Sequence, residues 1–126
     1  MLLVDAHLDL AMNALSLDRN LDLPVMEIRE REQGLDQKGR GRGTVSFPEM
    51  RKGEVGLSVV TVIKRTQWQG SPANGVACQE ISYAAARGQL SYYRVLESQG
   101  KVRLIEDVAD LDEHLSKWDV DLCGRL

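Results

Sequence analysis

Cysteine, long apolar runs and secretion signals are scarce or missing in this sequence. The two cysteines, Cys78 and Cys123, lie far apart and form no pairing motif, which favours reduced thiols and a cytoplasmic location. There is no run of about 18 apolar residues, so we expect no membrane-spanning helix. The apolar start, Met1–Val4, has neither the basic leader nor the cleavage site of a secretion signal. The sequence therefore predicts a cytoplasmic protein without a membrane partner.

Positive charge and aromatic side chains are also in short supply. With 16 Lys and Arg against 19 Asp and Glu, the net charge is −3, and aromatic residues make up 5% of the chain. A nucleic-acid-binding surface needs clustered positive charge and aromatic platforms on which bases stack. We therefore expect no nucleic acid among the partners. The length of 126 residues is enough for one domain with an apolar core.

The start of the chain, Leu2–Leu10, contains the candidate site. A short apolar run passes into alternating polar and apolar residues, as in a strand whose end is partly exposed. Because the side chains of a strand change face at every residue, Asp5, His7 and Asp9 are expected to point the same way. An imidazole and a carboxylate two residues apart at a strand end can bind one divalent metal, and both ligand types suit zinc. The alternative is a half-buried strand whose polar residues only mark its end.

The hydrophobic pattern alternates between strands and helices. We predict strands at residues 2–7, 55–63 and 102–105, of which the second is β-branched and almost uncharged. Residues 10–17 are apolar enough for a short helix or a packed loop. Further helices are predicted at 25–33, at 47–52 after a capping box of Ser46 and Glu49, and at 76–99 and 108–118. This order is typical of an α/β fold with a parallel sheet, whose apolar strands are buried on both faces.

Several stretches resemble the membrane (renal) dipeptidase family of zinc hydrolases: Val4–Ala11 with Asn13–Leu15, Gly43–Gly53 with Val55–Val60, and Ala84–Gly100 around Gln89–Tyr93. Among them, only the His7-x-Asp9 pair carries chemistry. The family belongs to the metal-dependent amidohydrolase superfamily of (β/α)8 TIM barrels. The resemblance therefore implies parallel strands alternating with helices, and a site with two zinc ions that hydrolyses dipeptides. It assigns His7 and Asp9 to one of the zinc ions.

The resemblance also implies that residues 1–126 are a single incomplete domain, the N-terminal part of such a barrel. A complete barrel needs about 250 residues. The family's bridging glutamate, its other histidine ligands and its catalytic acid have no counterpart here, so no catalytic residue is assigned. Because catalytic zinc needs three protein ligands and a water, we expect this chain to be inactive alone. Its uncovered strand edges and apolar helix faces are expected to favour self-association.

Asp5 and Trp68 are secondary candidates for this site. Asp5 lies one step before His7 on the same face of the strand, where it can orient His7 without binding the metal itself. Trp68 follows the strand predicted at 55–63, and barrel enzymes build their sites at such strand ends. It either walls the substrate pocket or anchors a loop, and the loop anchor is favoured. His114 lies on the charged side of its helix and is interpreted as a surface residue.

Two charged segments are interpreted as surface structure. Lys38–Gly43 alternates basic residues with glycine but lacks the spacing of a P-loop and is short for an RNA-binding tract. A mobile surface loop is therefore favoured over a phosphate cradle. The charges near the end of the helix at 25–33, Glu32 included, are interpreted as a solvated and self-paired face.

Three functions follow from these observations. The favoured one is the N-terminal part of a zinc dipeptidase, inactive without the remainder of its barrel. The second is a small α/β protein without catalysis, an interaction module or the relic of a truncated gene, which binds no zinc. The third is another amidohydrolase-type metal hydrolase, which is disfavoured because many of those relatives begin with His-x-His where this chain has His7-x-Asp9.

Overall fold

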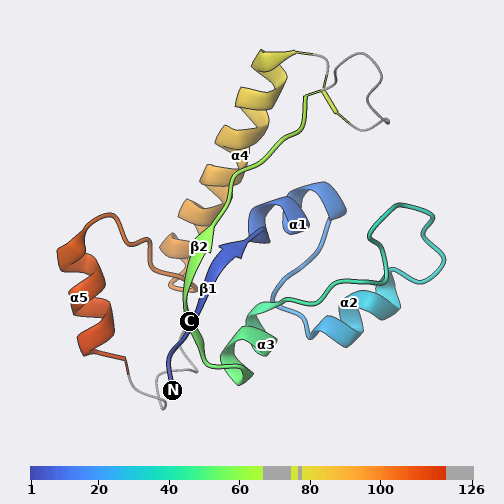
Figure 1. The fold of residues 1–126 in the computed structure, drawn as a ribbon. Coiled ribbons are helices and arrows are strands. Elements are labelled where there is room, and N and C mark those ends of the chain that lie inside the picture. The colour runs from blue at the N-terminus through green and yellow to red at the C-terminus, as the bar shows by residue number, and fades with distance from the viewer. Residues whose placement is uncertain (67–74, 77, 119–126) are drawn as a thin grey trace.

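Two parallel strands and their connecting helices form the fold of the computed structural model, which describes residues 1–66, 75–76 and 78–118 (Figure 1). In chain order the elements are β1 (Leu3–Leu8), α1 (Leu10–Leu17), α2 (Val25–Arg31), α3 (Phe47–Lys52), β2 (Val55–Val60), α4 (Gln79–Ser98) and α5 (Val108–Ser116). The predicted α/β class with parallel pairing is confirmed, whereas the assignment to the N-terminal part of a (β/α)8 barrel stays a prediction. Within the described ranges, no helix is long and apolar enough to span a bilayer. The predictions for Trp68 and Cys123 lie outside the described residues.

Parallel pairing brings the C-terminal ends of both strands to the same edge of the sheet. Leu3 pairs with Val55 near the start of the ladder, and Leu8 pairs with Val60 at its end. The connection between the strands is a crossover that contains three helices, as parallel neighbours require. One residue beyond the ladder, the N–H of Thr61 donates a hydrogen bond of 3.1 Å to the carbonyl oxygen of Leu8. The residues that follow β1 therefore meet those that follow β2.

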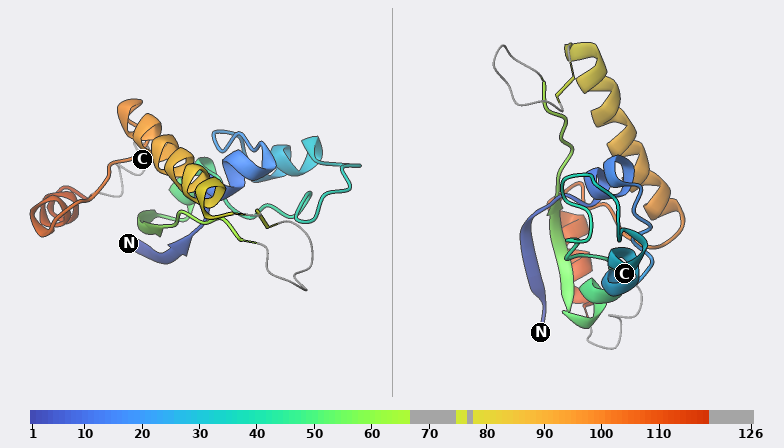
Figure 2. Two further views of the ribbon diagram at one scale, coloured as in Figure 1. Left: turned by 90° about the horizontal axis from the view of Figure 1, so that it is seen from above. Right: turned by 90° about the vertical axis from the view of Figure 1, so that its right-hand side faces the viewer.

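The apolar core lies between the sheet and the helices. Helix α1 packs against α4, and α3 packs against β2. Figure 2 shows α1 and α4 together on one side of the two strands. The repeat of apolar residues with helical spacing gives helices α1 to α4 a face to bury, whereas α5 (Val108–Ser116) has no fully buried residue. The buried core residues are Leu8, Leu10, Ala11, Ala14, Leu21, Ile28, Phe47, Met50, Tyr93 and Leu96.

The two strands are covered less completely than their composition predicts. Val4 in β1 is 52% exposed and Val59 in β2 is 58% exposed. Burial on both faces needs helices on both sides of a sheet. Since α1 and α4 lie on the same side (Figure 2), the prediction that both strands are buried on both faces is wrong for the described chain.

The predicted strand at residues 102–105 is not a strand in the described chain. Val102 and Leu104 pack against the core as single side chains. The backbone N–H of Leu104 donates a 2.9 Å hydrogen bond to the Glu97 carboxylate at the end of α4. The segment therefore packs its apolar side chains and gives this N–H a hydrogen-bond acceptor without pairing with a neighbouring strand. The predicted helix at 76–99 is observed as Gln79–Ser98, and the strand predicted at 55–63 ends at Val60.

Helix α5 contacts β2 through His114, and Trp118, two residues beyond the end of the helix, lies against Gly56 as well. Nε2 of His114 is 2.8 Å from the carbonyl oxygen of Gly56. The centroids of the His114 and Trp118 rings are 5.9 Å apart. The interpretation of His114 as a surface residue is wrong, because its ring is partly buried and lies against the backbone of β2.

Replacing Gly56 by alanine is expected to displace α5. A Cβ at this position would overlap the ring of Trp118 and the Cδ1 atom of Leu2. We expect the free energy of unfolding to fall by about 1–3 kcal/mol, as for other overpacked sites. Amide hydrogen exchange in α5 should become faster. Gly88→Ala is the matched control, because its Cβ would meet nothing within 4 Å. Unchanged exchange in α5 of Gly56→Ala would contradict this contact.

Candidate metal centre

The candidate metal ligands lie where β1 ends and α1 begins. His7 is the second-last residue of the strand, and Asp9 occupies the position just before the first residue of α1. The strand can extend no further because Leu10 and Ala11 are buried in the core as part of the helix. The candidate pair is thus held between two regular elements, at the C-terminal edge of the sheet.

The structure brings His7 and Asp9 together. Nε2 of His7 is 3.4 Å from Oδ1 of Asp9, and their side chains are 72% and 31% exposed. The imidazole is therefore open to solvent, whereas the carboxylate is partly enclosed. A neutral imidazole nitrogen and a carboxylate oxygen are both ligands that zinc accepts.

Asp5 also lies near His7. Oδ1 of Asp5 accepts a 2.9 Å hydrogen bond from the backbone N–H of His7. This bond holds the main chain at His7. The carboxylate therefore restrains the backbone of His7, from which the imidazole side chain extends.

Thr61 and Tyr93 belong to the same cluster, and the sequence patterns did not single them out. The hydroxyl of Thr61 donates a hydrogen bond to Oδ1 of Asp9. The hydroxyl of Tyr93 donates to the carbonyl oxygen of Thr61 at 3.0 Å and accepts from the N–H of Ala11 at 3.1 Å. The available signal was a threonine near the end of the strongly apolar strand predicted at 55–63, because parallel strands end at the same edge of a sheet. Tyr93 is only 2% exposed and belongs to the apolar core.

The described residues do not complete a zinc site. Among them, no group of three or more His, Cys, Asp and Glu side chains gathers in a way that could hold a metal ion. Catalytic zinc takes three protein ligands and a water. His7 and Asp9 therefore form at most part of a metal centre within the described chain.

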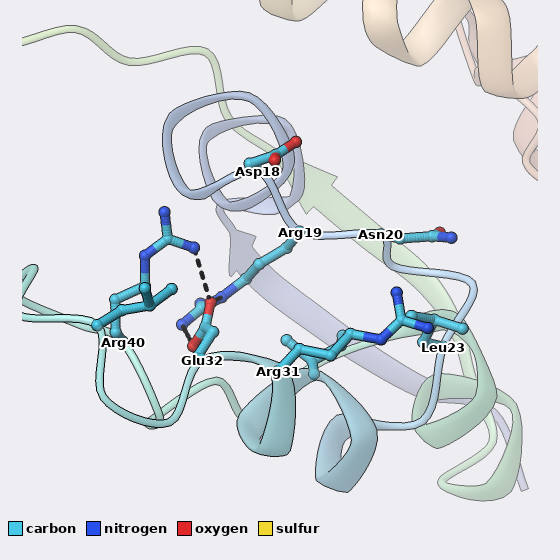
Figure 3. A pocket seen from close by; sticks show the side chains of 9 residues that line it. Asp18, Arg19, Asn20, Leu23, Arg31, Glu32 and Arg40 are labelled. Carbon is cyan, nitrogen blue, oxygen red and sulfur yellow. Dashed lines mark hydrogen bonds and ion pairs between the residues drawn. The ribbon is translucent and has the colours of Figure 1, made fainter.

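A second polar cluster surrounds a hollow of about 490 Å³ between the end of α1, helix α2 and the loop that follows α2 (Figure 3). Neither His7 nor Asp9 lines this hollow, so it is separate from the candidate metal centre. Its lining mixes charged and apolar side chains, namely Asp18, Arg19, Asn20, Leu23, Ile28, Arg31, Glu32, Leu35 and Arg40.

Arg19 and Glu32 form a buried ion pair beside this hollow (Figure 3). Nε and Nη2 of Arg19 lie 2.7 and 2.9 Å from the two carboxylate oxygens of Glu32. The two side chains are only 5% and 4% exposed. The prediction that Glu32 belongs to a solvated face is therefore wrong, since it turns inward from the end of α2 to neutralise a buried arginine.

The glycine-rich loop Lys38–Gly43 wraps around this pair. Nη2 of Arg19 donates to the carbonyl oxygen of Gly39 at 2.7 Å, and the N–H of Gly41 donates to Glu32 at 2.7 Å. Both glycines have positive φ, 94° and 66°, which side chains disfavour. The interpretation as a mobile loop is therefore wrong for its middle, whose main chain is held at two points by buried charges.

The charge of Glu32 is strongly stabilised in the folded state. Hydrogen bonds from Arg19 hold the pKa of this carboxyl at about 2, below its ordinary value of 4.5, and outweigh the opposing effect of burial. Because the folded pKa is the lower one, this stabilisation is complete above the ordinary value. It is lost as the pH falls from 4.5 to about 2.

The difference in the free energy of unfolding between the native chain and Glu32→Gln, called the stability gap below, is therefore expected to depend on pH. The gap should shrink by about 3 kcal/mol between pH 6 and pH 2, since one pKa unit corresponds to about 1.4 kcal/mol. Urea unfolding of both proteins across this range measures it. Other carboxylates titrate in both proteins and cancel in the difference. A gap that does not change with pH would contradict the lowered pKa.

Comparisons with protein-family models, with curated proteins and with solved structures find no match for this chain.

Proposed function

We propose that this chain supplies the first metal-binding strand of a zinc-dependent dipeptidase, with His7 and Asp9 as ligands of one zinc ion. The observation that carries the proposal is the 3.4 Å separation between Nε2 of His7 and Oδ1 of Asp9. Two ligand atoms that each lie about 2.0–2.1 Å from a tetrahedral zinc ion are about 3.4 Å apart. The pair therefore has the spacing that a shared ion needs before any ion is bound.

The position of the pair supports the same proposal. Both residues lie at the C-terminal end of a parallel strand, where barrel enzymes place their catalytic groups. The exposed imidazole of His7 is accessible to an incoming ion. The resemblance of Val4–Ala11 to the membrane dipeptidase family adds the substrate class, a dipeptide, and the second zinc ion.

The proposed reaction is hydrolysis of the peptide bond of a dipeptide. A zinc ion held by His7 and Asp9 would lower the pKa of a water bound to it and would polarise the substrate carbonyl. This chain's own contribution is to hold the ion through a neutral imidazole and a carboxylate, with Asp5 fixing the main chain of His7. The remaining ligands and the catalytic acid are proposed to come from further strands of the barrel. The described chain alone is accordingly proposed to be inactive.

A zinc titration of the purified chain tests the proposal. The chain has two histidines, so ¹⁵N signals of both imidazoles can be followed separately by NMR. We expect Nε2 of His7 to shift in a saturable way and His114 to stay unchanged. His7→Ala and Asp9→Asn should each weaken binding at least about tenfold, because zinc loses one of two ligands. His114→Gln is the matched control and should bind zinc like the native chain.

Two results would count against the proposal. Zinc binding that survives His7→Ala would place the ion elsewhere. A titration in which the imidazole ¹⁵N signals do not shift would favour the alternative of a non-catalytic α/β protein. The dipeptidase step is tested on the protein from its native source. We expect an intact mass well above 14.1 kDa and dipeptide hydrolysis that His7→Ala abolishes. A native mass of 14.1 kDa without hydrolysis would contradict the enzyme assignment.

A further inference from the structure

A chain of hydrogen bonds links helix α4 to the carboxylate of Asp9. It starts at the hydroxyl of Tyr93, which donates to the carbonyl oxygen of Thr61 at 3.0 Å. The N–H of Thr61 donates to the carbonyl oxygen of Leu8 at 3.1 Å, which fixes Thr61 against the end of β1. The side-chain hydroxyl of Thr61 then donates to Oδ1 of Asp9.

Helix α4 anchors both the Tyr93 end of this series of hydrogen bonds and the segment after β2 that contains Thr61. Tyr93 is 2% exposed, and its hydroxyl accepts a hydrogen bond from the N–H of Ala11 while it donates to Thr61. One turn earlier in α4, the side-chain amide of Gln89 pairs with both the N–H and the carbonyl oxygen of Ile63, at 2.7 Å each. Two side chains of α4 thus hold the segment after β2 in the way that a neighbouring strand would.

The bond from Thr61 has a specific consequence for the candidate metal centre. An aspartate that is about one-third exposed can rotate between staggered positions unless a partner selects one of them. Oδ1 of Asp9 is the atom that receives the Thr61 hydroxyl, and the same atom lies 3.4 Å from Nε2 of His7. A carboxylate oxygen has two lone pairs, so one can accept the hydroxyl while the other faces the imidazole.

We propose that Thr61 is a positioning residue for Asp9, and that Tyr93 positions Thr61. The hydroxyl of Thr61 selects the side-chain conformation in which Oδ1 of Asp9 faces His7. Carboxylates that bind metals are commonly held by such partners, and loss of a partner weakens metal binding about 10- to 100-fold. The effect on zinc rests on the proposed function, whereas the effect on the Asp9 side chain does not.

The test compares Thr61→Val, which removes only the hydroxyl, with Thr61→Ser, which keeps it. The Hα–Hβ couplings of Asp9 report its side-chain conformation without any metal. We expect one conformation in the native chain and in Thr61→Ser, and an average of several in Thr61→Val. Zinc affinity should fall at least about tenfold in Thr61→Val and return in Thr61→Ser. Tyr93→Phe, which leaves the Thr61 hydroxyl in place, should give a smaller change in the same direction.

The outcomes separate this inference from the proposed function. Averaged couplings of Asp9 in the native chain would overturn the positioning role, even if Thr61→Val fails to fold. A single conformation and native zinc affinity in a folded Thr61→Val would overturn it as well. If Thr61→Val releases the Asp9 side chain but the native chain binds no zinc, the positioning role stands and the zinc proposal fails.

Discussion

Replacing Arg19 by methionine is expected to lower the free energy of unfolding by about 3–5 kcal/mol, because a buried carboxylate loses its main partner. The guanidinium makes two hydrogen bonds to Glu32, one to the carbonyl oxygen of Gly39 and one of 2.5 Å to the side chain of Asn13. Methionine keeps an apolar stem of similar length, so the loss reports mainly on charge and hydrogen bonding. Urea unfolding followed by circular dichroism measures the change.

The control for this prediction is a second arginine at the same hollow. Arg31 pairs with Glu27, and these side chains are 63% and 42% exposed. Exposed pairs contribute little, so Arg31→Met should cost less than about 1 kcal/mol. Adding Glu32→Leu to Arg19→Met should recover part of the loss, because it removes a buried charge that has lost its main partner. Equal losses for the two arginines would contradict the importance of burial.

Replacing Phe47 by alanine has an expected effect of similar size, about 3–5 kcal/mol, because a fully buried ring leaves a cavity. Phe47 is the only phenylalanine of the chain and is 1% exposed at the start of α3. Its N–H also donates to the carbonyl oxygen of Leu21 at 2.9 Å, which joins α3 to the segment before α2. Chemical unfolding of the purified variant measures the loss.

Val59→Ala is the matched control for this cavity. Val59 is also apolar but is 58% exposed in β2, so its truncation removes little buried surface. The expected change stays within about 0.5 kcal/mol. A loss for Val59→Ala as large as that for Phe47→Ala would show that this face of the sheet is covered in solution.

Only those residues of the candidate site that are close in sequence could be predicted to lie together. His7 and Asp9 are two residues apart, so the alternation of a strand was enough to predict that they meet. Thr61 contacts Asp9 across 52 positions of the chain. The sequence pattern of neither segment predicts that contact. The contact depends on the parallel register of β1 with β2 and on the hydrogen bond by which Tyr93 anchors the segment after β2.

The same distinction explains the wrong prediction for Glu32. The charges near the end of α2 have the spacing of a solvated face, and Arg31 with Glu27 does form such an exposed pair. Spacing cannot tell which carboxylate meets a buried arginine from another element. Arg19 does so for Glu32, and the resulting pair also holds the loop at Gly41.

The elements that could be predicted from sequence are those whose signal is local: the alternating start of β1, the β-branched run of β2 and the amphipathic stripes of α4 and α5. Each depends on a repeat of about 2 or 3.6 residues, which the chain carries without reference to its partners. Two features depend on the tertiary structure instead: Val102 and Leu104 pack against the core without strand pairing, and His114 faces Gly56. Those outcomes depend on which surfaces the other elements leave free, since burial and long-range hydrogen bonds are set by neighbours distant in sequence.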